Sequence, residues 1–194
     1  MTRVDFEALG RANVVTAAGQ EIALASLFGT GPCLLAFLRH FGCVACSEQI
    51  TRLSPRLREL AQLGVAVVCV GNGEKRYLDG FIERHALSDK HVHVVSDVER
   101  ASFRAAGMLR SWWSVFGPRA LYGELRGRGA GHQFRGIEGD ALQQGGVVLL
   151  DADRQVALHY VGRATGDYAD PNLVVGAALQ LQARAALRKG SPVV

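Results

Sequence analysis

Residues 33–49 read CLLAFLRHFGCVACSEQ, and this stretch decides the fold because a strand pattern gives way to a helix pattern inside it. The run 33–38 is apolar at every position, which predicts a strand in the interior of a sheet. After the two cysteines, apolar residues recur at helical spacing and predict a helix from about Cys43 to Leu63. The first cysteine therefore stands where a buried strand turns into a helix.

The two cysteines of this stretch, Cys43 and Cys46, are separated by two residues, and their position favours chemistry over packing. The first turn of a helix has unpaired N–H groups, which together with the helix dipole stabilise a negative charge. Because the thiolate is the reactive form of cysteine, this placement is typical of redox thiols. We expect one anionic and accessible sulfur with the other within reach, rather than a buried and inert pair.

A metal site is the other interpretation of this segment, since His40, Cys43 and Cys46 supply nitrogen and sulfur ligands close together. Structural zinc sites normally use two such ligand pairs, and this chain has one. The remaining cysteines, Cys33 and Cys69, lie inside apolar strand patterns, where cysteine serves as a small core residue. We therefore expect no metal.

Size and composition indicate a single domain over residues 1–194, with 48% hydrophobic residues to supply its core. No apolar run is long enough to span a bilayer, and the N-terminus does not resemble a signal peptide. A reducing compartment suits the four cysteines, so we expect a cytoplasmic protein. The net charge of +4 comes with no recognised nucleic-acid motif, and we expect neither a nucleic-acid partner nor a membrane.

Strand and helix patterns alternate along the chain, which predicts a parallel-rich sheet covered by helices on both faces. The predicted strands are an N-terminal hairpin of Asn13–Thr16 and Glu21–Leu24, then residues 33–38, 65–70, 91–95, 147–150 and 156–160. The predicted helices are 43–63, which Gly64 ends, then 74–85, 99–106, and a last helix that starts near Pro171 and buries Leu173, Val174, Ala177 and Leu181.

Residues 110–137 break this alternation and predict a helical insertion that ends in a loop rich in glycine and arginine. Its aromatic residues are expected to pack on the core of the domain. The alternatives are a lid over the cysteines, a dimer surface and a helix that lies on a membrane surface. A membrane-surface helix needs an unbroken amphipathic pattern, and Gly117-Pro118 interrupts it here. The aromatic residues include Trp112, Trp113 and Phe116. The arginines expected to line a solvated loop are Arg126, Arg128 and Arg135.

Three segments resemble the peroxiredoxin-like branch of the alkyl hydroperoxide reductase/thiol-specific antioxidant (AhpC/TSA) superfamily. They are FLRHFGCVAC at 37–46, VVSD at 94–97 with FRAAGM at 103–108, and GDALQQGGVVLLD at 139–151. With its strand, CxxC and helix in that order, the chain is also similar to thioredoxins. The resemblance covers roughly residues 10 to 180. It implies a thioredoxin-like α/β fold, with a central mixed sheet flanked by helices, and cysteine redox chemistry.

The resemblance also implies roles for individual residues. Cys43 aligns with the attacking, peroxidatic cysteine, and Cys46 would resolve its oxidised form, because one helical turn brings the two sulfurs together. Two positions depart from the family. Where peroxiredoxins have threonine or serine this chain has His40, either a partner of the thiolate or a cap for the strand end. Where they have an arginine it has Gly145, and Arg39 could replace that arginine only by turning toward Cys43.

The segment Gln143-Gln144-Gly145-Gly146 corresponds to the loop that faces the redox centre in this superfamily. Its glycines would let the backbone approach a substrate closely, so we expect these four residues to contact substrate.

The resulting hypothesis is a thiol oxidoreductase that reduces a peroxide or a disulfide through the CxxC pair, without a cofactor. A thioredoxin- or glutathione-type system would reduce it again, and a homodimer is possible. The resemblance leaves two other functions open. One is a thioredoxin-coupled reductase of a bulky organic peroxide, such as a cyclic endoperoxide. The other is a redox-responsive binding protein without turnover.

Overall fold

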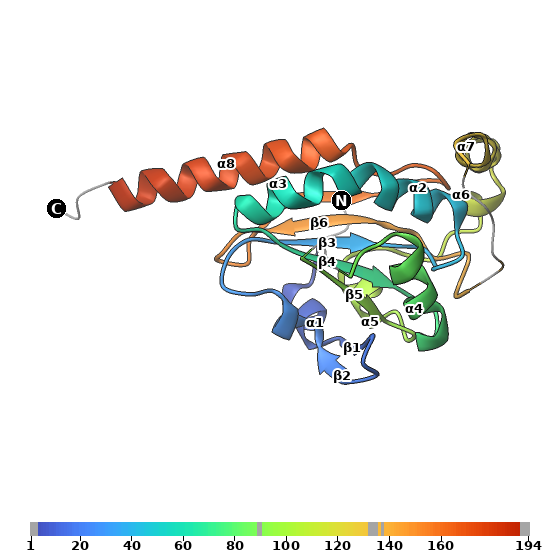
Figure 1. Ribbon diagram of the computed structural model, residues 1–194, viewed down its shortest axis with the longest axis horizontal. Helices are drawn as coiled ribbons and strands as arrows, with labels where there is room; N and C mark the ends of the chain where they lie inside the picture. Colours follow the sequence, from blue (N-terminus) through green and yellow to red (C-terminus); the bar gives the residue numbers. More distant parts are fainter. Residues whose placement is uncertain (1–3, 89–90, 132–135, 137, 191–194) are drawn as a thin grey trace.

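The structure, a computed structural model, describes residues 4–88, 91–131, 136 and 138–190. Its centre is a seven-stranded sheet in the order β2-β1-β5-β4-β3-β6-β7 (Figure 1). The strands are β1 Asn13–Thr16, β2 Glu21–Ala23, β3 Cys33–Phe37, β4 Ala66–Gly71, β5 Val92–Ser96, β6 Gly146–Leu150 and β7 Val156–Val161. The N-terminal hairpin, the strand from Cys33 and the central strand β4 confirm the predictions.

The sheet is mixed, as the resemblance implied, so the prediction of a parallel-rich sheet from the alternating pattern was wrong. Only β3–β4 and β4–β5 pair in parallel among the described strands, while β1–β2, β1–β5, β3–β6 and β6–β7 are antiparallel. The short turn between β6 and β7 accounts for one of these pairs, because parallel neighbours need a long crossover connection.

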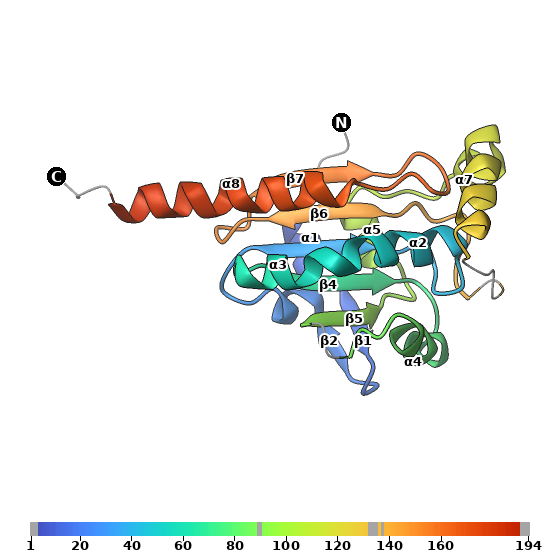
Figure 2. The same ribbon diagram turned by 45° about the horizontal axis from the view of Figure 1, so that its top comes forward.

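Helices cover both faces of the sheet (Figures 1 and 2). They are α1 Phe6–Arg11, α2 Val44–Leu53, α3 Leu57–Gln62, α4 Lys75–Arg84, α5 Ala101–Ala105, α6 Trp113–Phe116, α7 Pro118–Gly129 and α8 Pro171–Gly190, with 3-10 turns η1 Leu24–Leu27 and η2 Ser54–Arg56. One core lies under α2, α3, α4 and α8, and the other under α1, η1 and α5. Strand β3 serves both cores, because Leu34 and Ala36 face the first while Leu35 and Phe37 face the second.

The predicted helix over residues 43–63 is two helices. The 3-10 turn η2 separates α2 from α3 at Ser54-Pro55. Proline has no N–H and its ring crowds the preceding turn, so the regular α-helical hydrogen bonds stop there. The end of the second helix confirms the prediction, because Gly64 adopts a positive φ of 72°.

The last helix, α8, begins at Pro171 as predicted and buries Val174 and Leu181 against the sheet. Leu173, which was predicted to be buried, is 49% exposed. The C-terminal part of α8 runs past the ends of the strands in both views, and its residues 182–188 are exposed (Figures 1 and 2).

The insertion forms α6 and α7, which lie at the end of the sheet beside the start of α2 (Figures 1 and 2). The helix α7 continues to Gly129, where a glycine- and arginine-rich loop was predicted, and Arg135 falls outside the described residues. Burial of the aromatic residues was also a wrong prediction, since Trp112, Trp113 and Phe116 are all more than half exposed. The side of α7 that faces the domain carries the small residues Ala120, Gly123 and Gly127 instead.

No helix in the part of the chain that the structure describes combines the length and the apolar character needed to cross a membrane.

Candidate active site

The candidate site lies where the parallel strands β3 and β4 end side by side. The chain leaves β3 through Arg39 and His40 and leaves β4 at Asn72. The side-chain amide of Asn72 donates hydrogen bonds to the carbonyl oxygens of Arg39 and Asp140, and its oxygen accepts one from the Asp140 N–H at 2.7 Å. Asn72 thus fixes the segment that leads from β3 to the cysteines.

Cys43 and Cys46 occupy the first turn of α2, as the sequence predicts. Cys43 is the N-cap residue, and its Sγ accepts a hydrogen bond from the Cys46 backbone N–H at 3.4 Å. Cys46 points back toward the strand end, where its Sγ accepts from the backbone N–H of Arg39 at 3.2 Å. The two thiols lie within hydrogen-bond reach of each other in this turn.

The pKa values of the two thiols shift in opposite directions. A hydrogen bond from the Cys46 thiol lowers the pKa of Cys43, and the Arg39 charge and the N–H groups of Ala45 and Cys46 lower it further, against the opposing effect of burial. Burial raises the pKa of Cys46 well above its ordinary value, and its hydrogen bond to Cys43 adds to this. Cys43 is therefore the sulfur prepared to be the thiolate, and Cys46 is prepared to keep its proton.

Arg39 is turned into the site. Its side chain is buried and donates a hydrogen bond from Nη1 to the hydroxyl of Thr165. Its positive charge lowers the pKa of Cys43. Arg39 thus lines the same cavity as Cys43, and its role in place of the family's arginine stays a prediction.

His40 is buried beside Arg39 and Asp140. Burial lowers its pKa to about 4, the Arg39 charge acts in the same direction, and the Asp140 charge opposes them. The ring is therefore neutral at physiological pH. Its Nδ1 has no hydrogen-bond partner in the described part of the chain. A neutral ring can exchange a hydrogen bond with a ligand, but it cannot act as an imidazolium acid, so its catalytic role also stays a prediction.

Of the four residues predicted to contact substrate, only Gly145 lines the cavity at the cysteines. A Cβ at Gly145 would lie 2.7 Å from the Phe37 carbonyl oxygen, so only glycine fits beside the end of β3. Gln143 donates to the Met108 carbonyl at 2.9 Å, and Gln144 accepts from the Leu109 N–H at 3.0 Å. The two glutamine side chains thus brace the segment before the insertion, and Gly146 begins β6.

The cysteines are covered, which corrects the expectation of an accessible sulfur. Cys43 is 4% and Cys46 is 5% exposed. The cavity beside them measures about 20 Å³, room for about one water-sized molecule. Its lining consists of Arg39, Cys43, Ala45, Cys46, Gln49, Gly145, Ala164, Gly166, Asp167 and Tyr168. The sequence pattern places the thiols at a helix start, but it says nothing of the loop at 164–168 that closes over them.

A cluster that the sequence analysis missed joins this loop to the insertion. Glu48 is 3% exposed, and its carboxylate binds Arg126 at 3.2 Å and Arg52 at 2.8 Å. Burial acts against the charge of Glu48, but hydrogen bonds with Tyr168 and Arg126 outweigh it and lower the pKa of this carboxyl. Arg126 was predicted to line a solvated loop and instead neutralises a buried carboxylate. Their separation in the sequence left no local pattern to find.

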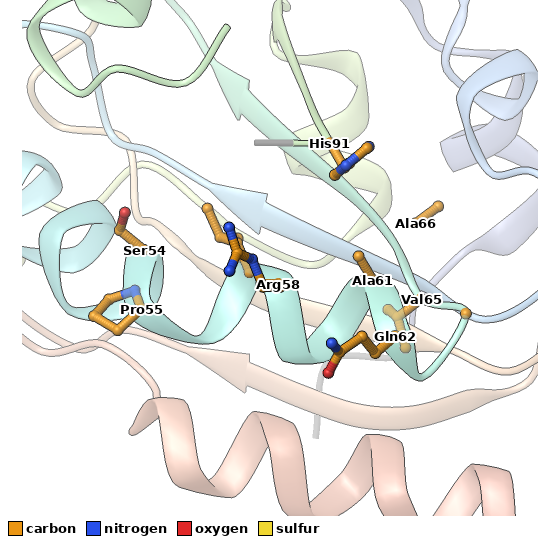
Figure 3. A pocket seen from close by; sticks show the side chains of 10 residues that line it. Ser54, Pro55, Arg58, Ala61, Gln62, Val65, Ala66 and His91 are labelled. Atoms are coloured by element: carbon orange, nitrogen blue, oxygen red, sulfur yellow. The ribbon is translucent and has the colours of Figure 1, made fainter. Parts of the chain in front are cut away.

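A groove elsewhere on the molecule lies away from the thiols. It measures about 790 Å³, and Figure 3 shows Arg58 and Gln62 from α3 and His91 from the segment before β5 among its lining residues. Val65 and Ala66 place it at the start of β4, the opposite end of the sheet from Cys43. Among the described residues no group of three or more His, Cys, Asp and Glu side chains is arranged to hold a metal ion.

Comparisons with known proteins agree with the geometry. The model of the family described as AhpC/TSA antioxidant enzyme matches residues 52–164. A prostamide/prostaglandin F synthase of Sus scrofa is 31% identical over 99% of this chain and 96% of its own length. Peroxiredoxin-like 2C of Homo sapiens is 24% identical over 77% of this chain and 69% of its own. The structure of Xanthomonas campestris peroxiredoxin Q superposes with a TM-score of 0.64 at 15% identity, over 91% of this chain and 94% of that one. This likeness shows a thioredoxin-like fold.

Proposed function

The chain belongs to the AhpC/TSA antioxidant enzyme family, and on that premise we propose how its two buried cysteines divide the reaction. Members of the family are thiol-dependent oxidoreductases of peroxiredoxin-like type, and this chain is one of them. We propose that Cys43 is the attacking thiolate and Cys46 the resolving thiol. The observation that carries this assignment is the place of Cys43 at the N-cap of α2, where its sulfur accepts the Cys46 N–H at 3.4 Å and its pKa is lowered while that of Cys46 is raised.

With a peroxide as substrate, the Cys43 thiolate attacks one oxygen of the O–O bond. That bond breaks, the departing oxygen takes a proton and leaves as an alcohol or water, and Cys43 becomes a sulfenic acid. The Cys46 thiol then attacks the Cys43 sulfur and expels water, which leaves a Cys43–Cys46 disulfide. The two thiols have given two electrons to the peroxide. A dithiol reductant of thioredoxin type, or glutathione, then supplies two electrons that reduce the disulfide.

We propose the cytoplasm as the location of this cycle, because thiols are kept reduced there and the disulfide can be reopened.

The test is intact-protein mass spectrometry after addition of hydrogen peroxide in slight excess. The wild-type chain should lose two hydrogens, and a thioredoxin system should restore them. Cys43→Ser should show no loss, while Cys46→Ser should accumulate a sulfenic acid that a dimedone probe captures at Cys43. The double variant Cys33→Ala, Cys69→Ala serves as the control and should behave as wild type. Four free thiols in the treated wild-type chain would refute the assignment.

A second candidate is reduction of a bulky organic peroxide, and one observation favours it. A cavity of about 560 Å³ adjoins the small cavity at the cysteines and shares Ala164, Gly166 and Asp167 with it. Tyr122 and Tyr160 are among its lining residues. Its volume suits the body of an organic molecule, whereas the small cavity suits only a peroxide group. The Sus scrofa relative is named for prostamide and prostaglandin F synthesis.

The comparison that separates the two candidates is the oxidation rate of Cys43 with hydrogen peroxide, cumene hydroperoxide and a fatty-acid hydroperoxide. A rate that rises with the apolar body of the peroxide supports the second candidate. Substitution of Tyr160 by Ala should then slow only the bulky substrates. A rate that falls steadily with size excludes it.

A further inference from the structure

The proposed function requires that substrate and reductant reach Cys43, yet the described structure closes the site almost completely. Two pieces of the chain form the cover. One is the loop 164–168, which contributes Ala164, Gly166, Asp167 and Tyr168 to the cavity wall. The other is α7, which lies against both this loop and the first turn of α2. Whatever holds these pieces together determines what can enter.

One side chain, Arg126 of α7, bonds to both of the walls that α7 touches. Its Nη2 donates to the carboxylate of Glu48 on α2 at 3.2 Å. The same nitrogen donates to the Gly166 carbonyl at 2.8 Å and to the Tyr168 hydroxyl at 3.0 Å, both in the loop. Because the Glu48 carboxylate is buried, it holds its cationic partner strongly.

Two glycines of α7 show how closely this helix packs against α2 and the loop 164–168. A Cβ at Gly127 would lie 2.6 Å from Cγ1 of Val44, the residue that follows Cys43. A Cβ at Gly123 would lie 2.1 Å from the Thr165 carbonyl oxygen. Neither glycine has a positive φ, so the close approach of α7, rather than backbone conformation, requires glycine at both positions.

From these contacts we propose that Arg126 is a positioning residue that sets the size of molecule reaching Cys43, by clasping α7 to α2 and to the loop 164–168. The inference rests on the proposed role of Cys43. Small molecules reach the sulfur through local opening of the loop, while larger ones require α7 to separate from Glu48 and Gly166.

The test measures access to Cys43 without any need for turnover. Alkylation by iodoacetamide is compared with alkylation by a maleimide that carries a polyethylene glycol chain, each normalised to a free cysteine peptide. Arg126→Ala should raise the rate with the large reagent about tenfold and the rate with iodoacetamide about twofold. Arg126→Lys, which keeps the charge on a different head group, should fall between wild type and Arg126→Ala.

A purely steric variant tests the same seal by another route. Gly127→Val should push α7 off Val44 and produce the same preference for the large reagent. The matched control is Gly129→Ala, since a Cβ at Gly129 meets nothing within 4 Å. Arg128→Ala, at an exposed position on the same helix, is the control for loss of a cation.

Two outcomes would overturn the proposal. In the first, Arg126→Ala and Gly127→Val leave alkylation by the large reagent within about twofold of wild type. In the second, both reagents gain equally and the midpoint of the alkylation pH profile moves, which would make Arg126 a structural or electrostatic group rather than a clasp. If Cys43 is alkylated as proposed but never oxidised by peroxide, the proposed function fails while the clasp stands.

Discussion

Two buried cysteines in the sheet and one at a helix start have opposite pKa shifts in the same small protein. Cys33 and Cys69 lie in β3 and β4, inside the cores of the sheet. Burial raises the pKa of each of them to about 12, against an opposing effect of the Arg154 charge at Cys33. Cys43 is as thoroughly covered, and yet its pKa is lowered.

The difference teaches that burial alone does not decide the charge of a thiol. A strand offers a cysteine side chain no free N–H groups, because its backbone donors are used by the neighbouring strands. The first turn of a helix offers several, and α2 adds the Cys46 thiol as a further donor to the Cys43 sulfur. A covered thiolate is stable where donors are aimed at the sulfur and costly where they are not.

The largest expected effect is the difference in labelling between Cys43 and the two core cysteines, Cys33 and Cys69. At neutral pH a thiol with a pKa near 12 is ionised in fewer than about one molecule in ten thousand. Limited alkylation with iodoacetamide, followed by peptide mapping, should therefore modify Cys43 at least about a thousandfold faster than Cys33 or Cys69. In guanidinium chloride all four cysteines should react at similar rates. Equal labelling of Cys43 and Cys69 in the folded protein would break the comparison.

The next largest effect concerns His40, a buried group near the cysteines whose pKa is shifted mainly by burial. Its pKa is about 4 in the folded chain and about 6.5 in the unfolded one, so the unfolded chain takes up the proton first as the pH falls. Between pH 6.5 and pH 4 the wild-type chain should lose about 3 kcal/mol of unfolding free energy through this residue.

The measurement is urea denaturation of the wild type and of His40→Gln across that pH range. Other titrating groups affect both chains, so the difference between the two curves isolates His40. Parallel curves would mean that burial does not hold the ring neutral.

The smallest effect comes from the hydrogen bond between the two redox thiols. Cys46→Ala removes the donor and should slow alkylation of Cys43 at neutral pH by about tenfold, because the pKa of Cys43 rises. Cys46→Ser keeps an O–H donor and should retain most of the rate. If alanine and serine behave alike, the helix terminus and Arg39 by themselves hold the Cys43 charge.

Local patterns were sufficient for the framework of the fold. The apolar run at β3 and the turn before β2 each depend on residues close in the chain, and the structure confirms both. Local patterns were insufficient where one residue breaks a helix that the apolar spacing predicts to be continuous, as Pro55 does between α2 and α3. They also misplaced the aromatic side chains of the insertion, since hydrophobicity alone does not say which face of a helix meets the domain.

In the candidate site, too, some features follow from local sequence and others only from tertiary packing. The sequence by itself determined that a CxxC pair opens a helix after a buried strand, because strand period, helix period and cysteine spacing are all local. Only the tertiary structure decided that Arg39 turns inward to Thr165, and that Arg126 crosses to Glu48 and Gly166 to cover the pair. Contacts between residues so distant in the chain depend on how whole elements pack, and no periodicity records that packing.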